Sequence, residues 1–136
     1  VLLLEGGNEK ADAFAAADIA LAASGTVSLE LAVAGTPNVI AYKTSFLTAL
    51  VGRRLVQTPY TNLINIILKR LAVPEMIQED CRSDLLAEQI EILLGDKEKR
   101  LQQVADAKTA VHRLGMEGPL PSERAAKAVL EVLVNR

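Results

Sequence analysis

The stretch from Asp18 to Gly35, DIALAASGTVSLELAVAG, decides how this chain folds. Its first five residues, 18–22, predict a short strand that is apolar enough to be buried on both faces. A small polar turn follows, and the apolar run at 26–34 predicts a helix that ends at Gly35. A strand, a turn and a helix in this order form the repeating unit of a parallel α/β sheet.

The neighbouring segments continue this pattern. Residues 1–5 and 38–42 predict further strands, because they are short, apolar and partly β-branched. Residues 9–17 and 46–56 predict further helices. Strands that alternate with helices predict an α/β fold with a parallel sheet flanked by helices.

The last part of the chain, residues 83–136, has a different character. Its apolar residues recur at helical spacing, and Ser83, Asp96 and Ser122 are good N-caps, so we expect three amphipathic C-terminal helices. The expected core faces are Leu86, Ile90, Leu93 and Leu94 in the first helix, Leu101, Val104, Val111 and Leu114 in the second, and Ala126, Val129, Leu130 and Leu133 in the third.

Composition narrows the range of functions. The chain has 136 residues, 50% hydrophobic and 24% charged, which suits one packed domain. Its net charge of −2 and its lack of Trp argue against a nucleic-acid binder. Its one cysteine, Cys81, can form no internal disulfide or zinc cluster, and no apolar run reaches the roughly 18 residues that span a membrane. Because the chain starts at Val1 without Met or a leader, we expect it to open within a larger fold.

The turn Ser24-Gly25-Thr26 is the most informative polar segment. It lies between the carboxyl end of a predicted strand and the start of a helix, where parallel α/β sheets bind ligands. Backbone N–H groups and the positive end of the helix dipole point into this place, two hydroxyl groups add donors, and Gly25 lets an anion approach the backbone. These features suit a phosphate or a diphosphate. The same residues also make an ordinary helix N-cap, so both interpretations stay open.

Glu30 favours the nucleotide interpretation. It lies one helical turn beyond Thr26 and therefore on the same side of the predicted helix. Its two carboxylate oxygens could accept both hydroxyl groups of a ribose, as acidic residues do in dinucleotide-binding folds. The alternative is a solvated Glu. Apolar neighbours weaken this alternative, because a carboxylate in such a setting usually has a partner.

A longer run carries a resemblance to a known family. Residues 22–37, AASGTVSLELAVAGTP, resemble the nucleotide-binding loop and helix of GT-B glycosyltransferases, and most closely those of the lipid-A-disaccharide synthase family. The similarity continues in residues 41–43 (AYK), 59–60 (PY), 65–66 (NI), 73–81 (VPEMIQEDC) and 121–126 (PSERAA). It spans nearly the whole chain. One departure is Ile64, where many members carry Pro.

The resemblance implies a fold and a reaction. It implies a Rossmann-like UDP-sugar-binding core at residues 1–82, the helical C-terminal part of the same domain at 83–136, and an absent N-terminal domain that binds the acceptor. The family transfers 2,3-diacylglucosamine from its UDP derivative to 2,3-diacylglucosamine 1-phosphate, which gives lipid A disaccharide 1-phosphate and UDP. The general base is expected on the absent half, so we assign no catalytic residue here and expect the isolated chain to be inactive.

The resemblance also implies roles for individual residues. Ser24, Gly25 and Thr26 would face the diphosphate, and Glu30 would hold the ribose. Asn65 would lie near the sugar or the diphosphate, and Glu75 and Gln78 would line the donor side of the cleft. Fixed N–H donors would stabilise the charge of the leaving UDP, so no metal and no cofactor is implied.

Partners, location and alternatives follow from the same resemblance. We expect the two lipid substrates, peripheral association with the inner face of a Gram-negative inner membrane, a cytoplasmic location and a possible homodimer, without nucleic acid. The alternatives are a UDP-N-acetylglucosamine 2-epimerase-like or other GT-B enzyme domain and a non-catalytic UDP-binding module. Weaker candidate residues are Lys43 for a phosphate, Arg53 and Arg54 for anionic lipid, and His112 for catalysis. We interpret Cys81 as inert.

Overall fold

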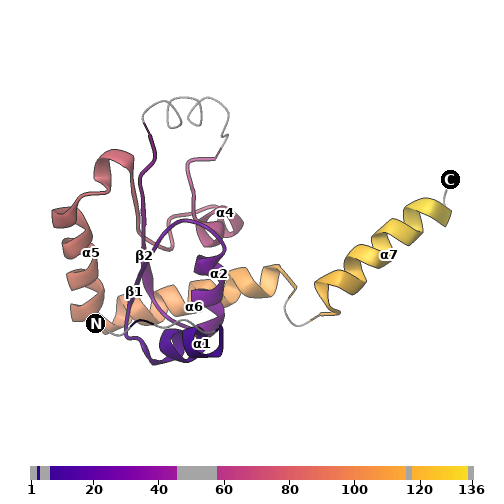
Figure 1. Ribbon diagram of the computed structural model, residues 1–136, viewed down its shortest axis with the longest axis horizontal. Coiled ribbons are helices and arrows are strands. Elements are labelled where there is room, and N and C mark those ends of the chain that lie inside the picture. Colours follow the sequence, from indigo (N-terminus) through magenta and orange to yellow (C-terminus); the bar gives the residue numbers. More distant parts are fainter. Residues whose placement is uncertain (1–2, 4–6, 46–57, 116–117, 135–136) are drawn as a thin grey trace.

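A three-stranded parallel sheet forms the centre of the molecule. The computed structural model describes residues 3, 7–45, 58–115 and 118–134. Its strands β1 (Ala20–Ala22), β2 (Asn38–Tyr42) and β3 (Glu75–Ile77) lie in the order β1-β2-β3. This sheet, with helices around it (Figure 1), confirms the predicted α/β Rossmann-like class.

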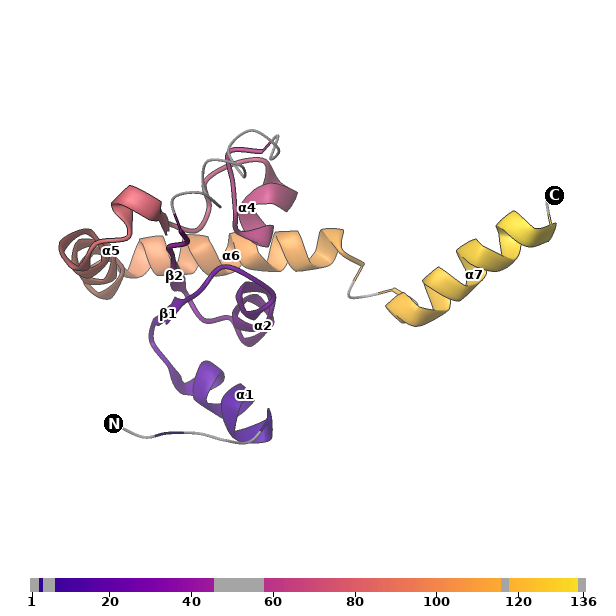
Figure 2. The same cartoon turned by 45° about the horizontal axis from the view of Figure 1, so that its top comes forward.

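Six helices surround or extend the sheet in the described ranges. They are α1 (Gly7–Ala16), α2 (Val27–Ala34), α4 (Leu63–Leu68), α5 (Ser83–Gly95), α6 (Lys97–Arg113) and α7 (Pro121–Val134), and a 3₁₀ turn covers Gln78–Asp80. The long helix α6 contacts both α2 and α4, and α1 packs beside α2 (Figure 2). The helices α2, α4 and α6 therefore pack against one another beside β2.

The strands agree only partly with the prediction. The strand at 38–42 is confirmed, and the one at 18–22 shrinks to three residues. Burial of that strand on both faces was wrong, because Leu21 is 53% exposed. Side chains alternate between the faces of a strand, and Leu21 points away from the face that carries its two alanine neighbours. The strand expected at 1–5 and the helix expected at 46–56 lie outside the described residues, except Leu3, which is exposed and in no strand.

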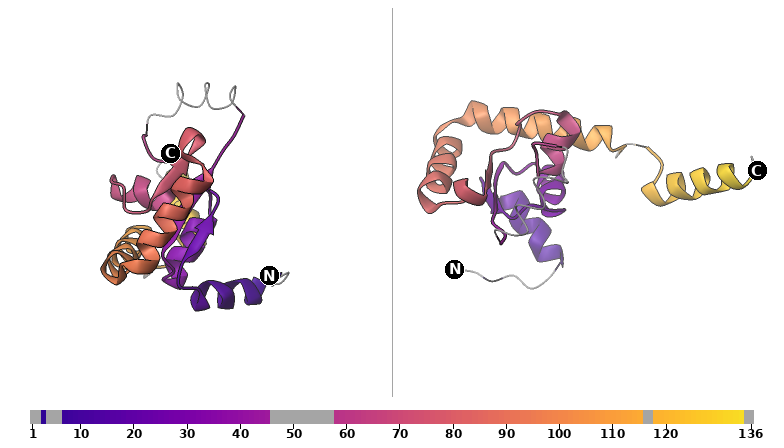
Figure 3. Two further views of the ribbon diagram at one scale, coloured as in Figure 1. Left: turned by 90° about the vertical axis from the view of Figure 1, so that its left-hand side faces the viewer. Right: turned by 90° about the horizontal axis from the view of Figure 1, so that it is seen from above.

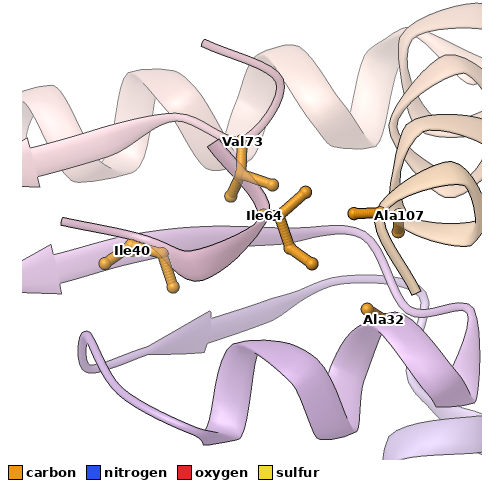
Figure 4. Close-up of a cluster of buried hydrophobic side chains, with 6 residues drawn as sticks. Ala32, Ile40, Ile64, Val73 and Ala107 are labelled. Carbon is orange, nitrogen blue, oxygen red and sulfur yellow. The ribbon is translucent and has the colours of Figure 1, made fainter. Parts of the chain in front are cut away.

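A small apolar cluster joins these elements. Its buried members come from α2, β2, α4, the segment before β3, and α6 (Figure 4), and they are Ala32, Ile40, Ile64, Val73, Ala107 and Ala110. Gly35 ends α2 in the left-handed conformation, with φ of 75°, as the sequence predicted. This stop turns the chain back so that β2 starts three residues later, at Asn38.

The buried face of α6 is more polar than expected. Its buried residues are Gln103, Asp106, Ala107 and Ala110, whereas the predicted core residues Leu101 and Leu114 are 58% and 44% exposed. Gln103 Oε1 accepts from the backbone N–H of Asn38 at 2.5 Å, and its Nε2 donates to the Asn38 carbonyl at 3.1 Å. The prediction is wrong for Leu101 and Leu114, while Val104 and Val111 are half-buried and Val111 packs against the core cluster. The difference arises because α6 packs against hydrogen-bonding groups of the sheet and loops, which polar side chains satisfy.

Helix α5 begins differently from the prediction. Arg82 holds the N-cap position and Ser83 is the first helical residue, while Arg82 pairs with Asp84 in the first turn. The hydrogen bond from Arg82 lowers the pKa of the Asp84 carboxyl. Leu94 was predicted in the core but is 55% exposed, because Leu93 holds the inward position. Asp96 caps α6 as expected, since its side chain accepts from the backbone N–H of Lys99 at 3.0 Å.

Helix α7 extends away from the rest of the described chain (Figures 1 and 3). It starts at Pro121, so Ser122 lies inside the helix and is not its cap. Its predicted core residues Val129, Leu130 and Leu133 are 60–63% exposed, and Ala126 is exposed as well. The spacing correctly predicted an amphipathic helix, but its apolar face packs on no other part of the described chain.

We expect the variant Gln103→Leu to lower the free energy of unfolding by about 2–4 kcal/mol, because it keeps the volume but leaves the N–H and C=O of Asn38 buried without partners. Urea denaturation measures this change. The control is Gln102→Leu, which removes a single bond to Asp106. We expect it to cost less than about 1 kcal/mol, because Arg70 still pairs with Asp106. Equal losses in both variants would contradict the role of Gln103.

Candidate functional site

The carboxyl ends of the three strands lie along one edge of the sheet. The strands end at Ala22, Tyr42 and Ile77, and Ala22 pairs with Ile40, which in turn pairs with Glu75. Because all strands are parallel, the segments that follow them meet at this edge. They contain most of the site residues that the sequence predicted. Residues 58–62, the segment before α4, lie at the same edge of the sheet (Figure 1).

The turn before α2 offers backbone N–H groups. Gly25 has φ of 147°, and a Cβ atom built there would have no neighbour within 4 Å, so the space beside it is open. Thr26 is the N-cap but makes no side-chain capping bond, and Ser28 Oγ donates to the Gly25 carbonyl at 2.8 Å. The structure shows no acceptor for the amides of residues 25–27 within its described ranges. Unpaired amides at the positive end of a helix suit an anion.

Ser24 contributes differently from what the sequence predicted. Its hydroxyl donates to the Thr61 carbonyl at 3.0 Å. In this structure the proton is therefore committed to the protein and is not directed at a ligand. The bond links the turn before α2 to the segment before α4, which lies 37 residues further along the chain.

Glu75 ties the segment before α4 to the start of β3. Its Oε2 accepts from the backbone N–H of Thr61 at 2.8 Å and from the Thr61 hydroxyl at 2.7 Å. Its Oε1 accepts from the backbone N–H of Asn62 at 3.0 Å and from Asn65 Nδ2 at 2.6 Å. Both oxygens of Glu75 therefore bind protein donors, and the side chain positions the site in this structure.

Asn65 is buried, with an exposed fraction of 0%. Its Oδ1 accepts from the backbone N–H groups of Ala72 and Val73, both at 2.8 Å. Its Nδ2 donates to the Val73 carbonyl at 2.8 Å and to Glu75. These bonds use both donors and both main acceptor directions of the amide. Asn65 therefore holds the segment between α4 and β3 and has no group left for a sugar or a diphosphate.

Gln78 lies at the carboxyl end of β3. Its Oε1 accepts from the backbone N–H of Thr44 at 2.8 Å, so it ties the end of β3 to the segment that follows β2. Gln78 has φ of 53°, which is a strained conformation for a residue with a side chain. Strain of this kind is often found at functional sites, because the surrounding structure must hold it in place.

Glu30 lies apart from these bonds. It stands one turn into α2, and its backbone N–H donates to the Thr26 carbonyl at 3.3 Å. Its carboxylate forms an ion pair with Lys10 of α1, and its side chain is 42% exposed. Glu30 is therefore on the flank of α2 that faces α1, one helical turn beyond the open amides and outside the network around Glu75.

Four contributing residues were missed by the sequence reasoning. They are Lys10, Thr44, Thr61 and Asn62. A signal for Asn62 was present, because Asn before an apolar run is a helix N-cap, and its side chain does accept from the backbone N–H of Ile64 at 2.7 Å. No local signal identified the other three, because their contacts join segments far apart in the sequence.

Weaker candidates gain little from the structure. Lys43 is exposed at the end of β2, His112 is exposed on α6, and Cys81 is half-buried after the 3₁₀ turn. Arg53 and Arg54 lie outside the described residues.

Within the described ranges, no group of three or more His, Cys, Asp or Glu side chains is placed to hold a metal ion. None of the helices described there has the length and apolar character needed to cross a membrane.

Comparison with known proteins gives a consistent result. The family model for lipid-A-disaccharide synthetase matches residues 1–129. The chain is 46% identical over 129 residues to the lipid-A-disaccharide synthase of Paramagnetospirillum magneticum, and the matched region covers 93% of this chain and 33% of that protein. It is 44% identical over 135 residues to that of Rhodospirillum centenum, covering 99% and 34%. It is 39% identical over 123 residues to that of Rickettsia prowazekii, covering 90% and 32%. The chain thus spans about a third of the length of these relatives.

We expect Glu75→Gln to lower the free energy of unfolding by about 2 kcal/mol, because an amide NH₂ would face the donors of Thr61 or Asn62 and leave them unpaired. Thermal and urea denaturation measure the change. The control is Glu91→Gln on the exposed side of α5, where we expect a change within about 0.5 kcal/mol. A Glu75→Gln variant as stable as the control would show that the carboxylate does not hold this edge.

Proposed function

Because the chain belongs to the lipid-A-disaccharide synthetase family, we propose that it forms the part of such an enzyme that binds the UDP-sugar donor. The single observation that carries this proposal is the set of open backbone amides at the start of α2, at the carboxyl edge of a parallel sheet. Ligands of α/β sheets bind at this edge, and helix N-termini bind phosphate groups.

The proposed reaction is transfer of 2,3-diacylglucosamine from its UDP derivative to 2,3-diacylglucosamine 1-phosphate. Its products are lipid A disaccharide 1-phosphate and UDP. The names of the relatives support this reaction, and the chain matches about a third of their length. We assign no general base to the described residues. Both substrates carry acyl chains, so the proposal includes peripheral association with the inner face of the inner membrane, and a homodimer is compatible with it.

The amides of residues 25–27 would bind the diphosphate. Negative charge develops on the β-phosphate oxygen as the bond to the sugar breaks, and N–H donors that the fold holds at the start of a helix would stabilise this charge without reorganisation. Gly25 lets the phosphate approach because no Cβ stands in the way. The Thr26 hydroxyl, which makes no capping bond, is a further donor for the diphosphate.

The remaining site residues divide into contacting and positioning groups. Glu30 would accept hydrogen bonds from the ribose hydroxyl groups, because it lies one turn along α2 from the open amides. Glu75 and Asn65 would position the edge, since their polar atoms are occupied by the protein. Ser24 would join the two loops through Thr61, and Gln78 would line the donor side.

Titration of this chain with UDP tests the nucleotide site directly. We expect Glu30→Ala to weaken UDP binding by about 1–3 kcal/mol, because the ribose hydroxyl groups lose charged acceptors. Isothermal titration calorimetry measures the affinity. The variant Glu91→Ala removes an exposed carboxylate from α5 and serves as the control with unchanged affinity. An affinity that Glu30→Ala leaves unchanged would remove Glu30 from the site.

A chimera tests the reaction. This chain would replace the matching third of the Paramagnetospirillum magneticum relative, and the product would be analysed by mass spectrometry. We expect disaccharide 1-phosphate and UDP, and we expect Glu30→Ala in the chimera to lower kcat/KM about 10- to 100-fold. The chimera with Glu91→Ala should retain its rate. Formation of a free epimerised sugar in place of the disaccharide would contradict the transferase proposal and support an epimerase.

A further inference from the structure

Helix α1 brings a cation to the flank of α2. The two helices contact each other, and Thr36 Oγ1 donates to the Phe14 carbonyl at 2.5 Å, which ties the end of α1 to the turn after α2. Across this contact Lys10 Nζ pairs with Glu30 Oε2. Glu30, the proposed ribose acceptor, is therefore paired with Lys10, to which the proposed function assigns no role.

Lys10 is itself held in place. Its Nζ lies 5.6 Å from the centroid of the Phe14 ring, one helical turn further along α1, at a distance that permits a cation–π interaction. The side chains of Lys10 and Glu30 are 49% and 42% exposed, so a ligand in solvent can reach the pair. The structure records no partner for Glu30 Oε1 among the described residues. Among the described residues, one carboxylate oxygen of Glu30 is thus paired with the ammonium group, and the other has no recorded protein partner.

This arrangement suits recognition of a vicinal diol. A carboxylate on a flexible, solvated side chain must lose its rotational freedom when it binds a ribose. The ammonium group restricts that freedom before the ligand arrives, and Oε2 still has lone pairs for a second hydroxyl. The positive charge of Lys10 also offsets repulsion between Glu30 and a nearby diphosphate, but this second effect is the same for a ribonucleotide and a deoxyribonucleotide.

We propose that Lys10 is a positioning residue that orients Glu30 and thereby sets the preference of the site for a ribonucleotide over a 2′-deoxyribonucleotide. The proposal rests on the proposed function, since it concerns the same nucleotide site. It assigns a specificity role to α1, to which the proposed function gives no part in binding the diphosphate.

The test compares the dissociation constants of UDP and 2′-deoxy-UDP for the 136-residue chain by isothermal titration calorimetry. For the unaltered chain we expect 2′-deoxy-UDP to bind about tenfold more weakly, because one charge-assisted hydrogen bond is lost. We expect Lys10→Met to reduce this ratio to about twofold and Lys10→Arg to restore it. Lys127→Met is the matched control, because Lys127 is an exposed lysine on α7 that also faces a carboxylate, Glu131. It should leave the ratio at about tenfold.

A second comparison shows whether Lys10 acts through Glu30. In a Glu30→Gln background we expect a ratio near twofold and no further change from Lys10→Met. A Lys10→Met variant that weakens both nucleotides equally and keeps the tenfold ratio overturns the positioning role and leaves the proposed function intact. An unaltered chain that binds both nucleotides equally overturns the ribose role of Glu30 and this inference with it. An unaltered chain that does not bind UDP overturns the proposed function itself.

Discussion

The Glu75 carboxylate is the group on which this edge of the sheet depends. Four donors reach its two oxygens, from Thr61, Asn62 and Asn65, and they come from the segment before α4 and from α4 itself. A carboxylate at the start of a strand is costly to cover unless such donors satisfy it. Once they do, the segment before α4 has one position relative to β3, and Ser24 then docks the turn before α2 onto Thr61. The open amides of α2 are thereby placed relative to the ends of all three strands.

Local patterns predicted the elements that carry their own signals. Residues 38–42 are apolar and β-branched and form β2, and α2 ends at Gly35, where a left-handed residue is needed. β3 and α4 were not predicted, because Glu75–Ile77 is a three-residue strand with a charged first residue and Leu63–Leu68 is a single short helix with a buried Asn. Pairing with β2 and the bonds of Asn65 make these segments regular, and neither cause is visible in a short window of sequence.

The predicted site shows the same division. The positions of the turn at residues 24–26 and of Glu30 on the following helix could be predicted from the order of strand, turn and helix, because that order fixes which backbone groups are free. That the Ser24 hydroxyl donates to Thr61 could not be predicted. The functions of Asn65 and Glu75 could not, because an Asn or a Glu in a sequence does not show whether its polar atoms face a ligand or the protein. The roles of Lys10 and Thr61 could not be predicted for a related reason, since each contacts its partner, Glu30 or Glu75, only in the folded structure.

Gln103 has a consequence for how the strands line up. Alternate backbone groups of a strand face the same neighbour, so Asn38 and Ile40 of β2 both face the side where β3 lies. Ile40 donates to the Pro74 carbonyl at 2.9 Å, but at Asn38 the amide of Gln103 takes the place of a strand. A slip of β3 by two residues toward the start of β2 would have to expel this amide. Through Gln103, helix α6, which begins some twenty residues after β3, thus blocks this shift in strand register. It keeps the sheet in the register that brings Glu75 to Thr61.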